Sequence, residues 1–161
     1  MMDVESGEVR PLTQDRHEEL DVHWSPHDGN LYFSAEMDQI YICEAQQLGF
    51  DPWSLRDRYI HVIMGKTSRD AFLTGNGLGH LMSEEARRLL HLLDAQFHRQ
   101  RMYISCTFFF GKLDRYEPRY AIANAVRALA LTRYATGYDL SHGFRRDLSG
   151  AVSARTNLTG A

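Results

Sequence analysis

The stretch that decides the fold is SEEARRLLHLLDAQFHRQR, residues 83–101. Its apolar side chains recur every three to four positions, the spacing that places side chains on one side of an α-helix. Ser83 suits the N-cap position, and the carboxylates of Glu84 and Glu85 favour the positive end of the helix dipole. The stretch therefore predicts an amphipathic helix. Its expected core-facing residues are Ala86, Leu89, Leu90, Leu93 and Phe97.

Similar patterns on both sides predict helices over residues 34–48, 51–64, 70–73 and 118–135. The clearest start is Asp51-Pro52, an N-cap followed by the residue preferred at the first helical position. The last helix is rich in alanine, which allows close packing between helices, and its expected core stripe is Ile122, Val126 and Leu129. These patterns predict a mainly α fold, a compact bundle of four to five helices.

Two segments leave a second fold class open. Residues 59–64 are β-branched and aromatic, and apolar and polar side chains alternate through residues 102–110, MYISCTFFF, as they do in strands. The second segment also continues a helical series, and a lone strand would have no partner, so we favour helix there. The alternative is an α+β fold with short strands near 59–64 and 102–110.

The two ends differ in composition from the middle. We expect an extended acidic arm over residues 1–30, a helical domain over 31–140 and a flexible polar tail over 141–161. The acidic N-terminus has no apolar signal region, and no apolar run approaches the roughly 20 residues of a membrane span. Cys43 and Cys106 each lie in an apolar run and read as reduced thiols facing the core. We therefore expect a cytoplasmic protein with no membrane contact.

Charge is distributed unevenly along the chain. Residues 1–86 carry 6 basic and 16 acidic side chains, a balance of −10, and residues 87–161 carry 12 and 5, a balance of +7. The only lysines are Lys66 and Lys112, so nearly all the positive charge is on arginine, which binds phosphate or carboxylate with two parallel hydrogen bonds. The basic half therefore predicts an acidic partner, either nucleic acid or protein, and the acidic half of a second copy would fit, which predicts a homo-oligomer.

Arginines and tyrosines interleave on the last predicted helix and its flanks. Arginine can bind phosphate or carboxylate groups, and tyrosine rings can stack on nucleic-acid bases. The predicted partner-binding residues are Arg115, Arg119, Tyr120, Arg127, Arg133, Arg145 and Arg146. The alternative interpretation is a solvated helix surface whose arginines pair with nearby acids.

Histidines support a competing hypothesis, a small enzyme with a pocket lined by histidine and tyrosine. His91 and His98 share one side of a predicted helix, and His61 and His80 complete the catalytic candidates, because imidazole exchanges protons near neutral pH. The glycines of residues 75–79 precede a helix start and would suit a phosphate or a lid, although no complete phosphate-binding motif is present.

A weak metal-ligand set lies in the N-terminal arm: His17, His23, His27 and Asp28. Borderline metals take such ligands, but the spacing matches no established helical motif, so we expect neither metal nor cofactor. The sequence does not decide whether the protein is an enzyme. A non-catalytic binding or regulatory protein is our first hypothesis, since the charge division extends over the whole chain, and a structural or assembly subunit is a third.

Overall fold

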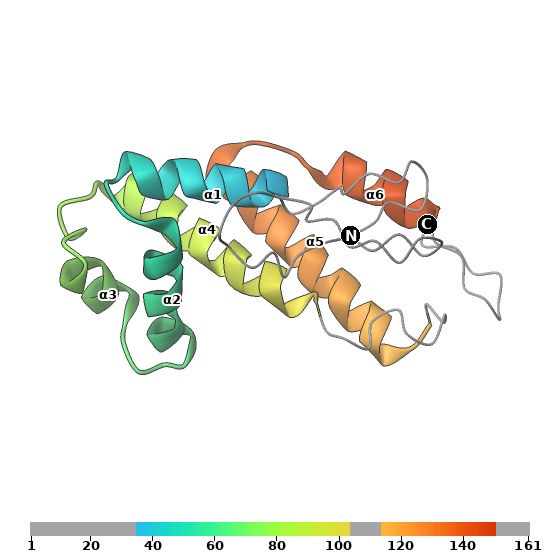
Figure 1. The fold of residues 1–161 in the computed structure, drawn as a ribbon, viewed down its shortest axis with the longest axis horizontal. Coiled ribbons are helices and arrows are strands. Elements are labelled where there is room, and N and C mark those ends of the chain that lie inside the picture. Colours follow the sequence, from blue (N-terminus) through green and yellow to red (C-terminus); the bar gives the residue numbers. More distant parts are fainter. Residues whose placement is uncertain (1–34, 104–113, 151–161) are drawn as a thin grey trace, which may run out of the picture.

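A computed structural model describes residues 35–103 and 114–150. These residues form α1 (Ala35–Gln47), α2 (Pro52–Ile63), α3 (Arg69–Gly75), α4 (Ser83–Arg101), α5 (Tyr116–Thr136) and α6 (Ser141–Ser149), with no strand in the described ranges. The two long helices α4 and α5 lie side by side, α2 and α3 gather at one end of the molecule, and α6 lies toward the other (Figure 1). The mainly α prediction is confirmed.

Local capping explains where several helices begin and end. The Asp51 side chain accepts a hydrogen bond from the Ser54 N–H at 2.8 Å, so the predicted cap of α2 is confirmed. α5 ends at Gly137, whose φ of 80° is the left-handed conformation that glycine adopts without a steric penalty. At α4 the cap prediction was wrong by one residue: Ser83 is the first helical residue, and the Glu85 side chain accepts a hydrogen bond from the N–H of Met82 at 3.0 Å.

The larger core joins α1, α2, α3 and the first half of α4; we call it the α1–α4 core. Leucine and aromatic side chains fill it, and Tyr59 meets Phe72 edge to face at 5.1 Å. Its buried residues are Tyr41, Ala45, Leu55, Tyr59, Phe72, Leu73, Leu78, Leu89, Leu92 and Leu93. Leu78 belongs to the loop after α3, so the core holds that loop as well as the helices.

α5 packs against its neighbours mainly through small side chains. Ala121, Ala125 and Ala128 are buried, which confirms that alanine permits close helix approach. The expected core stripe was only partly right: Leu129 is buried, Ile122 is half-buried, and Val126 is 52 % exposed. The buried side of α5 thus combines alanines with Leu129 and Leu131, and the small alanine side chains permit close approach of the neighbouring helices.

Buried polar side chains join α1 to α4. Arg99, only 2 % exposed, pairs with Asp38 at 2.6 Å, and the Gln96 amide donates to the same carboxylate at 2.9 Å. Near the other end of α1, Glu44 accepts from the Arg88 guanidinium. Buried charges need such partners, since an unpaired charge in the interior is strongly unfavourable.

Several further expectations can be placed on the structure. Residues 59–63 are helical, so the strand alternative for that segment was wrong, and residues 141–149, expected in a polar tail, form α6. α4 ends at Arg101, while residues 104–110 lie outside the described ranges, as do the arm at residues 1–30 and Cys106. Cys43 is exposed and free rather than facing the core. None of the described helices combines the length and apolar character needed to span a bilayer.

Candidate functional site

One side of α5 is exposed from end to end. It carries three arginines, two tyrosines and only small or aliphatic residues between them, with no acidic side chain. We call this set the arginine–tyrosine face: Tyr116, Arg119, Ala123, Val126, Arg127, Ala130, Arg133 and Tyr134. At 1.5 Å per residue, it extends over about 27 Å of helix. Tyr116 and Tyr134 are 74 % and 67 % exposed, which is high for large rings.

The three arginines of this face differ in their partners. Arg133 pairs with Asp139 at 3.2 Å. Arg119 and Arg127 are exposed, and neither forms an ion pair within the described part of the chain. Among the described residues, the face therefore presents two positive charges without an ion-pair partner to solvent.

The other predicted partner-binding residues lie elsewhere or have internal contacts. Arg115 donates two hydrogen bonds to Glu117, which lowers the pKa of that carboxyl to about 2. Tyr120 is half-buried, and its hydroxyl accepts from Arg101 at 2.6 Å. Arg145 and Arg146 are exposed on α6, a different helix.

α4 contributes a row of polar residues beside α5: Arg87, His91, Asp94, His98 and Arg101. Contacts at both ends show that α4 and α5 run antiparallel. Arg87 lies 5.0 Å from the ring centre of Tyr134, near the end of α5, whereas Arg101 lies 5.1 Å from that of Tyr120, near its start. We call these five residues the polar row of α4.

His98 is held by a partner on α5. Its Nδ1 lies 2.9 Å from Asn124 Oδ1, and because an amide oxygen can only accept, the imidazole nitrogen must be the donor. The Asn124 amide in turn donates to the Tyr120 carbonyl at 2.9 Å. These contacts give His98 a structural role in joining the two helices.

His91 has a different environment. Its ring meets Tyr134 edge to face at 5.1 Å, and its Nδ1 is buried with no hydrogen-bond partner among the described residues. Burial lowers the pKa of His91, and the positive charges of Arg87, Arg69 and Arg127 lower it further, against an opposing effect of Asp94. Positive side chains therefore outnumber negative ones around His91.

Asp94 is satisfied by two partners from other helices. Tyr59 donates to one carboxylate oxygen at 2.8 Å, and Arg69 to the other at 2.6 Å. Burial, followed by the adjacent Asp94 charge, raises the pKa of Tyr59 well above its ordinary value. The hydroxyl is thus a neutral donor, and the trio fastens α2 and α3 to α4.

The glycine loop has a structural explanation. Gly77 adopts φ 73°, Leu78 enters the core, and the Asn76 amide donates to the Phe72 carbonyl at 2.8 Å. The following helix starts with Glu84 and Glu85, whose charges oppose an anion at that end. The arrangement favours the connector interpretation over the phosphate site.

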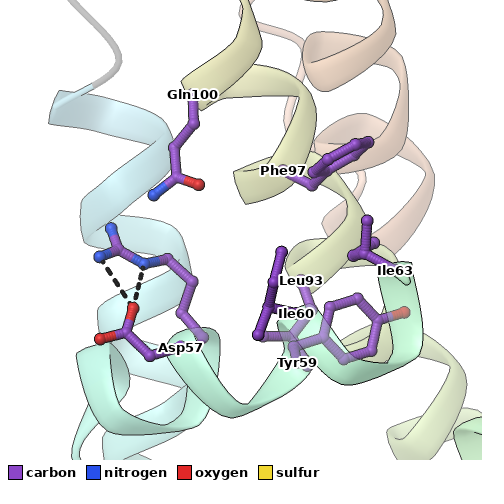
Figure 2. A pocket seen from close by; sticks show the side chains of 8 residues that line it. Asp57, Tyr59, Ile60, Ile63, Leu93, Phe97 and Gln100 are labelled. Carbon is purple, nitrogen blue, oxygen red and sulfur yellow. Dashed lines mark hydrogen bonds and ion pairs between the residues drawn. The ribbon is translucent and has the colours of Figure 1, made fainter. Parts of the chain in front are cut away.

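An open cavity of about 290 Å³ lies between α2 and α4. Figure 2 shows apolar side chains along it, with Gln100 on one side and Asp57 on another. The Asp57 carboxylate accepts a hydrogen bond from Arg56. The cavity is lined by Arg56, Asp57, Tyr59, Ile60, Ile63, Leu93, Phe97 and Gln100. The structure thus brings none of the four candidate histidines to this cavity.

The remaining histidines stay apart. His61 is exposed on α2, and His80 is exposed in the loop before α4, where its Nδ1 lies 2.9 Å from the Gly77 carbonyl. The described residues contain no group of three or more potential metal ligands. The weak set His17, His23, His27 and Asp28 lies outside the described residues.

Sequence reasoning missed several residues around the site. Arg69, Arg87 and Arg101 were not among the candidates, although Arg87, His91, Asp94, His98 and Arg101 recur at the same helical spacing as the apolar stripe. That second, polar periodicity was the available signal. Arg69 comes from a different helix, and only the fold shows that it reaches Asp94.

Comparison with known proteins gives a family. A family described as a domain of unknown function, DUF3536, matches residues 32–161. No match was found among curated proteins or among solved structures. Because the match covers most of the sequence, this chain belongs to the DUF3536 family.

Proposed function

We propose that this chain is a non-catalytic binding protein that engages an acidic protein surface through the arginine–tyrosine face. The observation that carries the proposal is the exposed side of α5, where exposed tyrosines at both ends flank arginines, two of which have no ion pair among the described residues. Exposed aromatic rings on a protein surface often mark an interaction site, because covering them with a partner removes apolar surface from water and lowers the free energy. Arginine and tyrosine are also the residues that most often dominate binding energy at interfaces.

Composition favours a protein partner over nucleic acid. Protein interfaces are enriched in aromatic residues and arginine and depleted in lysine and acids, as this face is. Nucleic-acid surfaces usually belong to strongly basic domains, whereas this chain has a net charge of −3 and a pI near 6.2. Val126 and the alanines beside it also offer nothing to a phosphate backbone but can pack against apolar side chains.

The proposal extends to partner and compartment. A second copy is one available acidic partner, because residues 1–86 carry a charge balance of −10. A free, exposed Cys43 fits a reducing compartment such as the cytoplasm. Light scattering over a range of concentrations tests the first point: a mass that rises with concentration supports self-association, and a monomer throughout contradicts it.

The experiment that tests the function uses two labelled probes in fluorescence anisotropy. The first is a 20-residue helical peptide with glutamate along one side and leucine at the edges, and the second is a 20-nucleotide single-stranded DNA. The test variant is Arg119→Ala with Arg127→Ala. The matched control, Arg56→Ala with Lys66→Ala, removes two positive charges away from the face.

We expect the wild-type chain to bind the peptide in preference to DNA. The face variant should lose at least about tenfold in affinity, the scale of an interface hot spot, while the control stays within about twofold. If the chain bound DNA more tightly than the peptide, and the face variant lost that binding, the partner would be a nucleic acid rather than a protein. If the face variant and the control bound the peptide with equal affinity, the arginine–tyrosine face would not be the binding surface.

A further inference from the structure

The end of the arginine–tyrosine face near Tyr134 is where α4 and α5 contribute jointly. The His91 and Tyr134 rings meet at an interplanar angle of 84°, and the Arg87 guanidinium lies over the same tyrosine. Tyr134 nevertheless remains largely exposed. Two helices therefore hold this ring in place while leaving it open to a partner.

The charges at this junction are balanced except at one residue. Arg69 is paired with Asp94 at 2.6 Å, and Arg87 with Glu84 at 2.5 Å. Arg127, two turns before Tyr134 on α5, has no ion pair among the described residues. Its guanidinium is thus the available binding group for a carboxylate here, and it can offer two parallel hydrogen bonds.

His91 adds a second group that can respond to an anion. Its Nδ1 is buried and has no hydrogen-bond partner among the described residues, while the side chain as a whole is only half-buried. The charged groups that face the ring are Glu84, Arg87 and Asp94 from α4, Arg69 from α3 and Arg127 from α5. A proton on His91 would therefore join an already positive junction, and a bound carboxylate would offset that repulsion.

We propose that this junction is the carboxylate anchor of the interface: one aspartate or glutamate side chain of the acidic partner pairs with Arg127, flanked by His91 and the Tyr134 ring. The inference rests on the proposed function and deepens it, because it names which arginine of the face carries specificity. Arg119, exposed on the same helix about 12 Å farther from this junction along the helix axis, contributes only general attraction.

A pH dependence follows from this geometry. Protonation of His91 adds a positive charge next to the bound carboxylate, so acidification strengthens binding. Since the surroundings lower the pKa of His91, the increase comes below the ordinary histidine value of about 6.5. The partner carboxylate stays ionised above about pH 5, so its own titration does not hide the effect.

The test compares Arg127→Ala, Arg119→Ala and His91→Gln, using the glutamate-bearing peptide between pH 5.2 and 8. Arg127→Ala should weaken binding about tenfold at pH 7, as expected for loss of a specific charge pair, and Arg119→Ala about twofold. The wild-type chain should bind more tightly toward pH 5.2, and His91→Gln should bind with a flat pH profile. Circular dichroism of each variant confirms that the helices are intact.

Two results overturn the anchor in distinguishable ways. Equal losses in the two arginine variants, or an unchanged pH profile in His91→Gln, would show that binding is spread over the face; the proposed function would then stand without the anchor. Absence of peptide binding by the wild-type chain would remove the proposed function and the anchor together.

Discussion

The α1–α4 core and the packing surface of α5 stabilise the same bundle by different means. In the first, leucines and aromatic rings are almost fully buried, as at Leu89 and Tyr59. In the second, buried alanines are accompanied by buried polar side chains such as Asn124 and Thr132. Large side chains stabilise by removing apolar surface from water, whereas small ones stabilise by allowing close backbone approach and short hydrogen bonds.

This difference explains where the candidate function lies. A helix held by small side chains on one side can carry exposed rings and arginines on the other, because its position does not depend on burying them. On α5, Val126 and Tyr134 can therefore be exposed although both side chains are large and could pack in a core. On α4, by contrast, Leu89, Leu92 and Leu93 are buried in the α1–α4 core, and Arg87, His91, His98 and Arg101 of the polar row contact α5.

The largest effect is expected in the α1–α4 core. Leu89→Ala removes a fully buried side chain and leaves a cavity, so the free energy of unfolding should fall by about 2–5 kcal/mol. Leu90→Ala, on the same helix but half-buried, is the matched control and should cost less. Urea denaturation followed by circular dichroism measures both, and equal losses would contradict the assignment of this core.

The fold was more predictable from the sequence than the site. A local signal such as Asp51-Pro52 acts on the neighbouring backbone, so it marked the start of α2 correctly. The pairing of Arg69 with Asp94, or of Arg99 with Asp38, joins residues from different helices, and no local pattern indicates it. To predict where the arginines of α5 lie, one must know which side of that helix is buried. The predicted core stripe included Val126, which is exposed, and left out the alanines, which are buried.

The buried polar link between α1 and α4 should have the next largest effect. Asp38→Ala removes the carboxylate that accepts from Gln96 and Arg99, so stability should fall by about 1.5–3 kcal/mol, the usual cost of losing hydrogen bonds to a charged group. Glu36→Ala, at an exposed position of α1, should change stability by less than about 0.5 kcal/mol. Indistinguishable variants would show that the link does not stabilise the bundle.

Overpacking tests whether alanine sets the position of α5. Ala128→Leu places a large side chain where no surface is exposed, and should destabilise by about 1–3 kcal/mol. Ala123→Leu adds the same atoms on the exposed side of the same helix and should stay within about 0.5 kcal/mol. Tolerance of leucine at both positions would mean that the packing around Ala128, which includes Met37 of α1 and Phe144 of α6, is looser than the structure shows.

Alkaline pH gives the smallest effect and concerns the aromatic part of the α1–α4 core. Tyr41 and Tyr59 have pKa values raised above the ordinary 10.0, first by burial. Their neutral forms therefore stabilise the fold fully below pH 10, and this stabilisation is lost as the pH rises and the unfolded chain ionises. At pH 11, Tyr59→Phe should reduce the alkaline loss of stability by about 1 kcal/mol. An unchanged alkaline slope in this variant would contradict the buried, neutral hydroxyl.

The central claim, that charge on the arginine–tyrosine face selects an acidic partner, is tested most directly by reversing that charge. The measurement is the affinity of Arg119→Glu with Arg127→Glu for two helical peptides, one with glutamate and one with lysine along its side. We predict that the variant loses the glutamate peptide and gains the lysine peptide, the reverse of the wild-type preference. Retention of the glutamate peptide by the reversed face would contradict the account.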